Sequence, residues 1–441
     1  MGGAAFFDLD RTLLRGPSGP AISEALRAEG VLGGAPRIPV EGLLYRLYDV
    51  VGETWPSMAL TRQAARLARG WPRAGVRAAG ERAAERLAAA VQPFARGIMD
   101  DHRTAGRPVV LATTTPEDMI RPLAERLGFD DVVATRYGVD GEGRYDGTID
   151  GEFVWGRGKL RAVRAWAEAH HLGLGESWAY SDSYYDTALL GAVGHPVAVN
   201  PDPRLLGVAL LRRWPIVHLD VPAGVPKLPV VGVEPQRLVQ ALVRPELLPW
   251  VRFEIEGIEG IPATGPAILA MNHRSYFDPV ALGIALARRG RTVRFLAKRE
   301  VCDAPVVGTV VRAMGAIRVD RSSRSDRPLA EAAVALAGGE LVAIMPQGTI
   351  PRGDAFFDPQ LKGRPGAARL AAETRAAVVP IGVWGTEHVW PRSERLPRMW
   401  NVVHPPTVSV RVGEPVELKY RSPQADTRRI MAAITGLLPP P

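Results

Sequence analysis

Hydrophobic and polar positions along the chain predict short buried strands that alternate with amphipathic helices. Residues 266–271 and 341–345 are uninterrupted apolar runs, which are typical of strands buried on both faces of a parallel sheet. A helical pattern follows such a run at 117–127, directly after the predicted strand 106–115. Because strands that alternate with helices build parallel sheets, we predict an α/β protein whose N-terminal part is a doubly wound sheet.

The same pattern predicts more than one domain. A chain of 441 residues exceeds what a single hydrophobic core usually supports. Prolines and glycines interrupt both periodicities at 221–233, so we predict a linker there between an N-terminal domain at 1–220 and a C-terminal domain at 234–441. An insertion rich in alanine, leucine and arginine at about 16–95 is expected to form a helical cap over the first domain.

Polar side chains gather at the ends of the predicted elements of the N-terminal domain. In chain order they are Asp8, Asp10, Thr113, Lys159, Asp182 and Asp186. Open α/β sheets bind their ligands at the carboxyl ends of the strands. Carboxylates that converge there favour a hard cation such as Mg²⁺, and a hydroxyl and a lysine beside them suit a phosphoryl group.

In this order and spacing, these segments resemble the haloacid dehalogenase superfamily, in its phosphoserine-phosphatase-like branch with a helical cap, over about residues 2–220. The resemblance implies that Asp8 is the nucleophile that becomes an aspartyl phosphate. It implies that Asp10 protonates the leaving oxygen and then activates water. Thr113 and Lys159 match the hydroxyl and the lysine that bind the phosphate.

The resemblance also implies a magnesium site. Asp182 matches the metal ligand that acts together with Asp8 and the backbone carbonyl of Asp10, and Asp186 matches the residue that supports this shell. The last motif departs from the family in one position, because its usual glycine is Ser181. The alternative is a domain that has lost catalysis and is kept for regulation or docking.

A second set of reactive side chains follows the predicted strand 266–271. His273 and Asp278 lie five residues apart between this strand and the next predicted helix. From the first helical turn, the carboxylate can hydrogen-bond to one ring nitrogen and leave the other free to take a proton from an alcohol. A surface histidine beside a capping aspartate has the same pattern, and the segment alone leaves both interpretations open.

Later strand ends supply residues for binding a substrate. The candidates are Lys298, Arg321, Gln347, Gly348, Thr349 and Arg352. The cationic members indicate an anionic acceptor head group, because guanidinium groups match the geometry of phosphate. The glycine permits close approach of the backbone to a ligand.

Together these segments resemble the glycerolipid acyltransferase family, of which 1-acylglycerol-3-phosphate acyltransferase is the best-known member, over about 250–418. The resemblance implies that His273 deprotonates the acceptor hydroxyl, which attacks the thioester of acyl-CoA or acyl carrier protein, while Asp278 orients the ring. The third motif departs from the family, because its usual Glu-Gly-Thr-Arg is Gln-Gly-Thr-Ile at 347–350. A carboxylate and an arginine tied to acceptor binding are therefore missing, and Arg352 is the expected replacement for the arginine.

The amino-acid composition indicates the cellular compartment and the kind of binding partner. A single cysteine, Cys302, excludes an internal disulfide and is typical of a reducing, cytoplasmic compartment. No apolar run approaches the roughly 18 residues that span a bilayer. The net charge of +8 favours an anionic surface, and the arginines lack the aromatic clustering of an RNA-binding surface. We therefore expect no nucleic acid, and peripheral binding to the inner face of the cell membrane. Residues 306–311 are the candidate contact, and a core helix is the alternative interpretation of this segment.

The sequence thus predicts a bifunctional enzyme of phospholipid biosynthesis. It is expected to convert 1-acylglycerol-3-phosphate to phosphatidate and to carry a Mg²⁺-dependent phosphomonoester phosphatase. Two alternatives remain open from the sequence. The acceptor is instead glycerol phosphate, a lysophospholipid or a sugar lipid, or the N-terminal domain is a regulatory module without catalysis.

Overall fold

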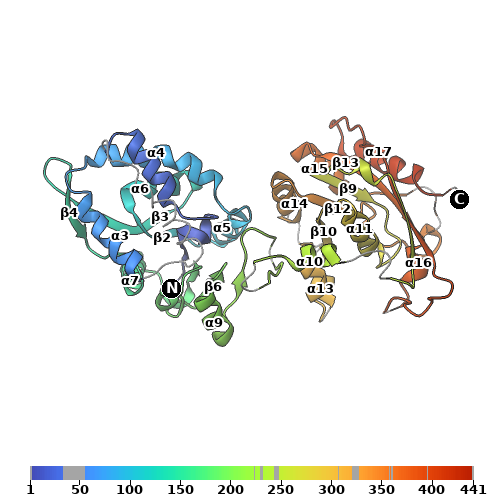
Figure 1. Ribbon diagram of the computed structural model, residues 1–441, viewed down its shortest axis with the longest axis horizontal. Helices are drawn as coiled ribbons and strands as arrows, with labels where there is room; N and C mark the ends of the chain where they lie inside the picture. Colours follow the sequence, from blue (N-terminus) through green and yellow to red (C-terminus); the bar gives the residue numbers. More distant parts are fainter. Residues whose placement is uncertain are drawn as a thin grey trace. The chain divides into compact units, whose positions relative to one another are not determined.

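The structure is a computed structural model that describes residues 2–32, 55–222, 224–228, 232–242, 248–305, 307–319, 327–356, 358, 361–394 and 396–439. The chain divides into two compact units, Met1–Asp220 and Val221–Pro441 (Figure 1). Each unit is built on one seven-stranded sheet. These sheets, covered by helices, confirm the predicted α/β fold class.

The sheet of the N-terminal unit has the strand order β4-β3-β2-β1-β5-β6-β7. Its strands are β1 (Ala5–Phe7), β2 (Val109–Pro116), β3 (Asp131–Val139), β4 (Tyr145–Asp150), β5 (Trp178–Ser181), β6 (His195–Val199) and β7 (Ile216–Val217). All neighbours are parallel except β3 and β4, which are antiparallel. The chain leaves β1 in the centre of the sheet, between β2 and β5, where the order of a doubly wound sheet reverses.

Both faces of this sheet are buried. Side chains alternate along a strand, so Phe6 joins the hydrophobic cluster on one face and Phe7 the cluster on the other. The helices are α1 (Gly19–Ala28), α3 (Trp55–Leu67), α4 (Arg73–Ala89), α5 (Ala95–Thr104), α6 (Glu117–Leu127), α7 (Arg157–Ala169), α8 (Thr187–Leu190) and α9 (Pro203–Arg212). The helix α6 ends as predicted at Gly128, whose φ of 72° needs a residue without a Cβ atom.

The described part of the predicted cap consists of α1, α3 and α4, and residues 33–54 of it lie outside the described residues. The helix α4 packs against both α1 and α6. The close approach to α6 occurs at Gly80, where a Cβ atom would lie 2.8 Å from the carbonyl oxygen of Met119. Glycine therefore sets how closely these two helices approach.

The sheet of the C-terminal unit has the order β11-β10-β12-β9-β13-β14-β8. Its strands are β8 (Arg252–Glu256), β9 (Ala267–Met271), β10 (Val293–Lys298), β11 (Ile317–Val319), β12 (Leu341–Ile344), β13 (Ala377–Trp384) and β14 (Thr407–Val412). The strands β9 to β13 are parallel to one another, and β14 runs antiparallel to β13. The carboxyl ends of β9, β10, β12 and β13 therefore meet at one edge.

Helices cover this second sheet. They are α10 (Pro235–Leu242), α11 (Asp278–Ala287), α12 (Arg299–Cys302), α13 (Val307–Ala313), α14 (Arg327–Ala337), α15 (Gly366–Thr374), α16 (Thr386–Val389) and α17 (Pro423–Gly436). The helix α11 is apolar on nearly all sides, as is typical of a buried helix. Its first residue is Asp278. In the parts of the chain that the structure describes, no helix combines the length and the hydrophobicity needed to cross a membrane.

Candidate active sites

The first candidate site begins where β1 ends. Asp8 follows Phe7 directly, and its backbone N–H donates to the carbonyl of Tyr180 on β5, 2.9 Å away. A helical turn, η1 (Leu9–Leu13), then reverses the chain, with Arg11 in the left-handed conformation at φ 60°. The backbone N–H of Ser18, where the cap begins, donates to Asp10 Oδ1 at 2.6 Å. The sheet and the start of the cap thus hold the two carboxylates of the first motif.

Lys159 links the first motif to the last one. It lies in the first turn of α7, with a side chain only 3% exposed. Its Nζ lies 2.7 Å from Asp8 Oδ1 and 2.6 Å from Asp186 Oδ2. Ser181 Oγ donates to the same Asp186 oxygen at 2.7 Å. The structure therefore brings Asp8 and Lys159 into contact although they lie 151 positions apart in the chain.

Asp182, directly after β5, is fixed by Thr12. The Thr12 hydroxyl donates to Asp182 Oδ1 at 2.9 Å, and the backbone N–H of Asp182 donates to Thr12 Oγ1 at 2.8 Å. The guanidinium of Arg11 lies 3.5 Å from the other carboxylate oxygen. Thr12 lies two positions after Asp10 in the first motif, but sequence reasoning assigned it no role.

Thr113 is placed as a donor. It is buried near the carboxyl end of β2, and its oxygen accepts the backbone N–H of Thr115 at 3.2 Å. A hydroxyl whose oxygen already accepts has its proton left to give to a ligand. This agrees with the predicted phosphate-binding role, which stays a prediction.

Burial dominates the electrostatics of the two carboxylates. It raises the pKa of Asp8 above the ordinary value, although the ammonium of Lys159 acts in the opposite direction. Burial, with the nearby charge of Asp8, also raises the pKa of Asp10 to about 6. A carboxyl group that titrates near neutral pH is suited to act as both acid and base.

The donor set fits a hard cation. Asp8 and Asp182 bring carboxylate oxygens to neighbouring strand ends, and Oδ1 of Asp186 is buried without a hydrogen-bond partner. Such oxygens are the ligands that Mg²⁺ prefers. Among the described residues, no three His, Cys, Asp or Glu side chains gather closely enough to enclose a metal by themselves. The fit is therefore to a cation held by two carboxylates and a backbone carbonyl, as the resemblance implied for Asp10.

The second candidate site begins where β9 ends. Asn272 ties β9 to β13, because its side chain donates to the carbonyl of Val383 at 2.7 Å and accepts the backbone N–H of Val383 at 2.8 Å. His273 follows with a side chain 18% exposed, and its Nδ1 lies 2.8 Å from Asp278 Oδ2. A carboxylate only accepts, so Nδ1 carries the proton and Nε2 is the free base. The predicted base and its orienter are in contact.

Asp278 is fully buried and held by further donors. Its Oδ2 also accepts the backbone N–H groups of Arg274 at 2.7 Å and Ser275 at 2.9 Å. Its Oδ1 accepts the hydroxyl of Thr386 at 2.5 Å. The hydroxyl oxygen of Ser275 accepts the N–H of Phe277, and this hydroxyl donates to the carbonyl of Trp390. Asp278 is therefore a buried carboxylate and not a surface cap, as the predicted orienting role requires.

The third motif lies directly beside the histidine. Gln347 Oε1 accepts the backbone N–H of His273 at 2.6 Å. Gly348 adopts φ 74° in the turn after β12, and Thr349 beyond it is exposed. Among the predicted substrate-binding residues, Gln347 thus hydrogen-bonds directly to the backbone of His273.

The structure also places two of the remaining predicted cations, Lys298 and Arg352, relative to His273. Lys298 ends β10, and β12 lies between β10 and β9, so it is about 10 Å away by strand spacing. Arg352 is exposed beyond the turn of the third motif. Arg321 lies outside the described residues. Their binding roles stay predictions.

The structure also adds two arginines that the motifs did not indicate. Arg392 donates to the carbonyl of Ile350 at 3.0 Å, so it places a guanidinium where the family arginine is absent. Arg274 pairs with Glu387 at 2.9 Å and lies 4.3 Å from the ring of Phe356. Spacing gave no signal for these contacts, because the partners come from distant segments.

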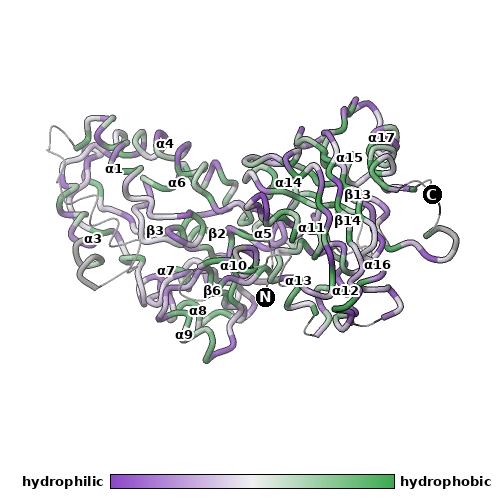
Figure 2. Tube along the Cα trace, turned by 45° about the vertical axis from the view of Figure 1, so that its right-hand side comes forward, coloured by the Kyte–Doolittle hydropathy of each residue, from purple (hydrophilic) through white to green (hydrophobic). Residues whose placement is uncertain are grey.

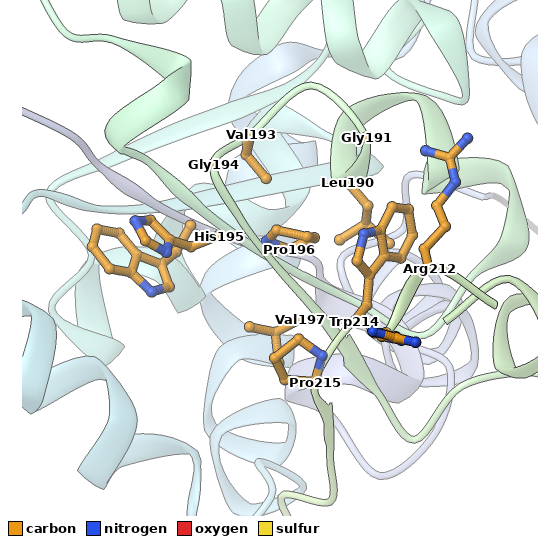
Figure 3. A pocket seen from close by; sticks show the side chains of 12 residues that line it. Leu190, Gly191, Val193, Gly194, His195, Pro196, Val197, Arg212, Trp214 and Pro215 are labelled. Atoms are coloured by element: carbon orange, nitrogen blue, oxygen red, sulfur yellow. The ribbon is translucent and has the colours of Figure 1, made fainter. Parts of the chain in front are cut away.

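A groove of about 490 Å³ lies elsewhere, at the amino ends of β5 and β6 (Figure 3). Trp178 stacks on His195 there with ring centroids 3.9 Å apart, and Figure 3 shows Arg212 and Trp214 among its lining side chains. The predicted catalytic residues, all of them described, lie at carboxyl ends of strands and do not line it. The groove is therefore not part of either candidate site.

Comparisons with known proteins bear on both units. The haloacid dehalogenase-like hydrolase profile matches residues 5–191, and the acyltransferase profile matches residues 252–384. The inhibition of morphological differentiation protein of Streptomyces azureus is 33% identical over 247 residues, 54% of this chain and 87% of that protein. A phosphoserine phosphatase of Mycobacterium tuberculosis is 34% identical over 218 residues, 48% of this chain and 70% of that protein.

A solved acyltransferase structure is also similar to this chain. It is the 1-acyl-sn-glycerophosphate acyltransferase PlsC from Thermotoga maritima, with 25% identity, a TM-score of 0.32, and coverage of 42% of this chain and 71% of that chain. The two profile matches agree with the two families that the sequence motifs resemble.

Proposed function

We propose that this chain, which belongs to the haloacid dehalogenase-like hydrolases and also carries an acyltransferase domain, acylates the free hydroxyl of 1-acylglycerol-3-phosphate to form phosphatidate. The acyl donor is an acyl thioester, acyl-CoA or acyl carrier protein. The N-terminal unit hydrolyses a phosphomonoester. Because the proposed acceptor is a membrane lipid, the protein works at the inner face of the cell membrane.

The contact between His273 and Asp278 carries the acyl-transfer proposal. With Nδ1–H donated to the carboxylate at 2.8 Å, Nε2 takes the proton of the acceptor hydroxyl as its oxygen attacks the thioester carbonyl. The carbon–sulfur bond of the thioester then breaks, and the leaving thiolate takes the proton from Nε2 of His273. Thr386 and two backbone N–H groups hold Asp278 still, so the ring keeps its tautomer and direction through the reaction.

The phosphatase proposal is carried by the position of Lys159 between Asp8 and Asp186. Asp8 attacks phosphorus, Asp10 protonates the leaving oxygen and later takes a proton from the attacking water, and Lys159 and Thr113 bind phosphate oxygens. Mg²⁺ held by Asp8, Asp182 and the backbone carbonyl of Asp10 would neutralise charge on the transferred phosphoryl group.

A different acceptor is the second candidate, and the third motif favours it. Ile350, which replaces the family arginine, is 4% exposed, so no cation extends from this position. Glycerol phosphate, a lysophospholipid or a sugar lipid are the acceptors to compare. Arg352 and Arg392 are the cations nearest to this turn in sequence or by hydrogen bond.

An assay of the full chain with acyl-CoA and this acceptor panel tests the proposal. We expect acylated lipid with the wild type and a loss of about 100- to 10,000-fold in His273→Ala, the range of general-base catalysis. Free phosphate release from phosphomonoesters is measured in the same samples. Near wild-type acyl transfer by a folded His273→Ala protein would contradict the mechanism, and transfer to another acceptor alone would replace the substrate.

A further inference from the structure

The exposed large hydrophobic side chains of the C-terminal unit are concentrated in the segments that follow the carboxyl ends of its parallel strands. They are Tyr276, Val280, Val301, Val307, Val310, Leu396, Met399, Trp400, Val402 and Val403. Elsewhere in the described part of this unit, only Leu238, Val239 and Tyr420 are similarly exposed. Single exposed apolar residues are ordinary, but a concentration at one edge marks an interaction surface.

The loop between α16 and β14 carries the largest part of this surface. Within it, Trp400 is 91% exposed, Val403 78% and Leu396 72%. Met399 and Val402 are exposed beside them. We call these five residues the apolar loop. Tryptophan with aliphatic neighbours is the combination that proteins place at the boundary between lipid and water.

The apolar loop lies at the edge that holds His273. It connects the carboxyl end of β13 to the start of the antiparallel β14, and β13 lies beside β9. Just before it, the carbonyl of Trp390 accepts the hydroxyl of Ser275 at 2.6 Å. Figure 1 places α16 and α13 at the same lower side of the C-terminal unit, and Figure 2 shows hydrophobic stretches in α12 and α13 there.

Positive charge accompanies the apolar side chains. Arg352, Lys362 and Arg364 are exposed in the segment that follows β12, whose carboxyl end lies at the same edge. Basic residues that flank exposed apolar ones favour a surface that is both apolar and anionic. A bilayer containing anionic lipid offers both properties.

We propose that the apolar loop inserts into the interfacial layer of an anionic bilayer and brings the His273 edge against it. The proposal deepens the acyltransferase function, on which the choice of a lipid partner rests. The main membrane contact in this proposal is residues 396–403, whereas the sequence pattern had indicated residues 306–311. The described residues of α13, with Val307 50% and Val310 58% exposed, form a second contact.

Flotation with vesicles tests the proposal on the full chain. Vesicles of phosphatidylcholine mixed with phosphatidylglycerol are compared with phosphatidylcholine alone, at low and high salt. We expect the wild type to float with the anionic vesicles. A Trp400→Ala, Val403→Ser variant should lose about tenfold or more in partitioning, because it removes the most exposed apolar groups. Leu211→Ser is the matched control, since Leu211 is 85% exposed in the N-terminal unit.

Each outcome of the flotation test either supports or contradicts membrane insertion of the apolar loop. Loss of flotation in the double variant, with Leu211→Ser unaffected, supports the proposal. Equal flotation of the double variant and the wild type, or no flotation of the wild type, overturns it, as does a dimer in solution that the double variant abolishes. Acyl transfer to a water-soluble, short-chain acceptor separates the two proposals. The double variant should keep this acyl transfer. If the wild type lacks acyl transfer to this acceptor, the acyltransferase function is contradicted, and the flotation result still tests membrane binding by itself.

Discussion

Thr386 completes the hydrogen bonding of the buried carboxylate of Asp278. Thr386→Val leaves one carboxylate oxygen without its donor, at a cost of about 1.5–3 kcal/mol for a hydrogen bond to a charged group. If this cost falls on the transition state, kcat drops roughly 10- to 100-fold. We expect little change in the acceptor KM, because Thr386 acts through Asp278. Thr386→Ser, which keeps the hydroxyl, should restore kcat, and a failure of this rescue would show that the contact is only structural.

Arg352 is the residue that tests whether the third motif binds phosphate. It is exposed and lies two residues beyond Ile350, a span of about 7 Å of extended chain. Arg352→Ala should raise the acceptor KM more than the donor KM, because an ionic contact made equally in ground and transition states is uniform binding. Arg392→Ala is the comparison variant. Steady-state kinetics in which neither variant changes the acceptor KM would remove this turn from acceptor binding.

At this scale the sequence predicts local contacts better than distant ones. The spacing of His273 and Asp278 was sufficient to predict their contact. Five residues that span a strand end and the first helical turn leave the two side chains little conformational freedom. The contacts of Gln347 and Thr386 could not be predicted, since they lie 74 and 108 positions from their partners. They depend on β12 and β13 flanking β9, which no local pattern encodes.

Among the helices, α4 and α5 offer a matched pair of glycine substitutions, Gly80 at the crossing of α4 with α6 and Gly97 on α5. Gly80 is buried where these helices cross, with no room for a Cβ atom, so Gly80→Ala should destabilise the N-terminal unit by about 1–3 kcal/mol. Gly97 on α5 has open space around it, so Gly97→Ala should stabilise by up to about 1 kcal/mol. Thermal unfolding measures both. A Gly80→Ala protein as stable as wild type would mean that the helices shift apart without cost.

The helix α5 packs on the sheet through His102, whose burial lowers its pKa to about 4. Arg107 donates to its Nδ1 at 2.8 Å, so Nε2 carries the proton and donates to the hydroxyl of Tyr180, also at 2.8 Å. The unfolded chain takes up a proton at about pH 6.5, but the folded chain does so only near pH 4. Stability should therefore fall as pH drops from about 6.5 to 4, by up to roughly 3 kcal/mol.

Urea unfolding at several pH values measures this effect. The His102→Gln variant is the comparison, because glutamine keeps hydrogen-bonding capacity but does not titrate. Its stability should depend less on pH than that of the wild type in this range. Parallel pH dependence of the two proteins would assign the acid sensitivity to other groups.

The elements themselves were largely predictable, but their order in the sheets was not. Apolar runs identified β2, β9 and β12, since strands buried in a parallel sheet are mostly apolar. The strand β8 pairs with β14 at the sheet edge and not with β9, the next strand in the chain, and no local pattern indicates this pairing. Periodicity reveals that a strand exists, whereas its neighbour is decided by the packing of the whole sheet.

At the scale of the whole molecule, each unit has its own sheet, core and candidate site, and this separation predicts that the two activities are independent. Asp8→Asn removes the proposed phosphatase nucleophile and a proposed metal ligand, so phosphate release should be abolished while acyl transfer stays within a few-fold of wild type. EDTA should inhibit phosphate release alone, because the acyl-transfer chemistry of His273 and Asp278 needs no cation. Both products are measured in one reaction mixture. If EDTA stops acyl transfer as well, either the cation belongs to the C-terminal site or the units are coupled, and Asp8→Asn separates these cases because it acts only on the N-terminal site.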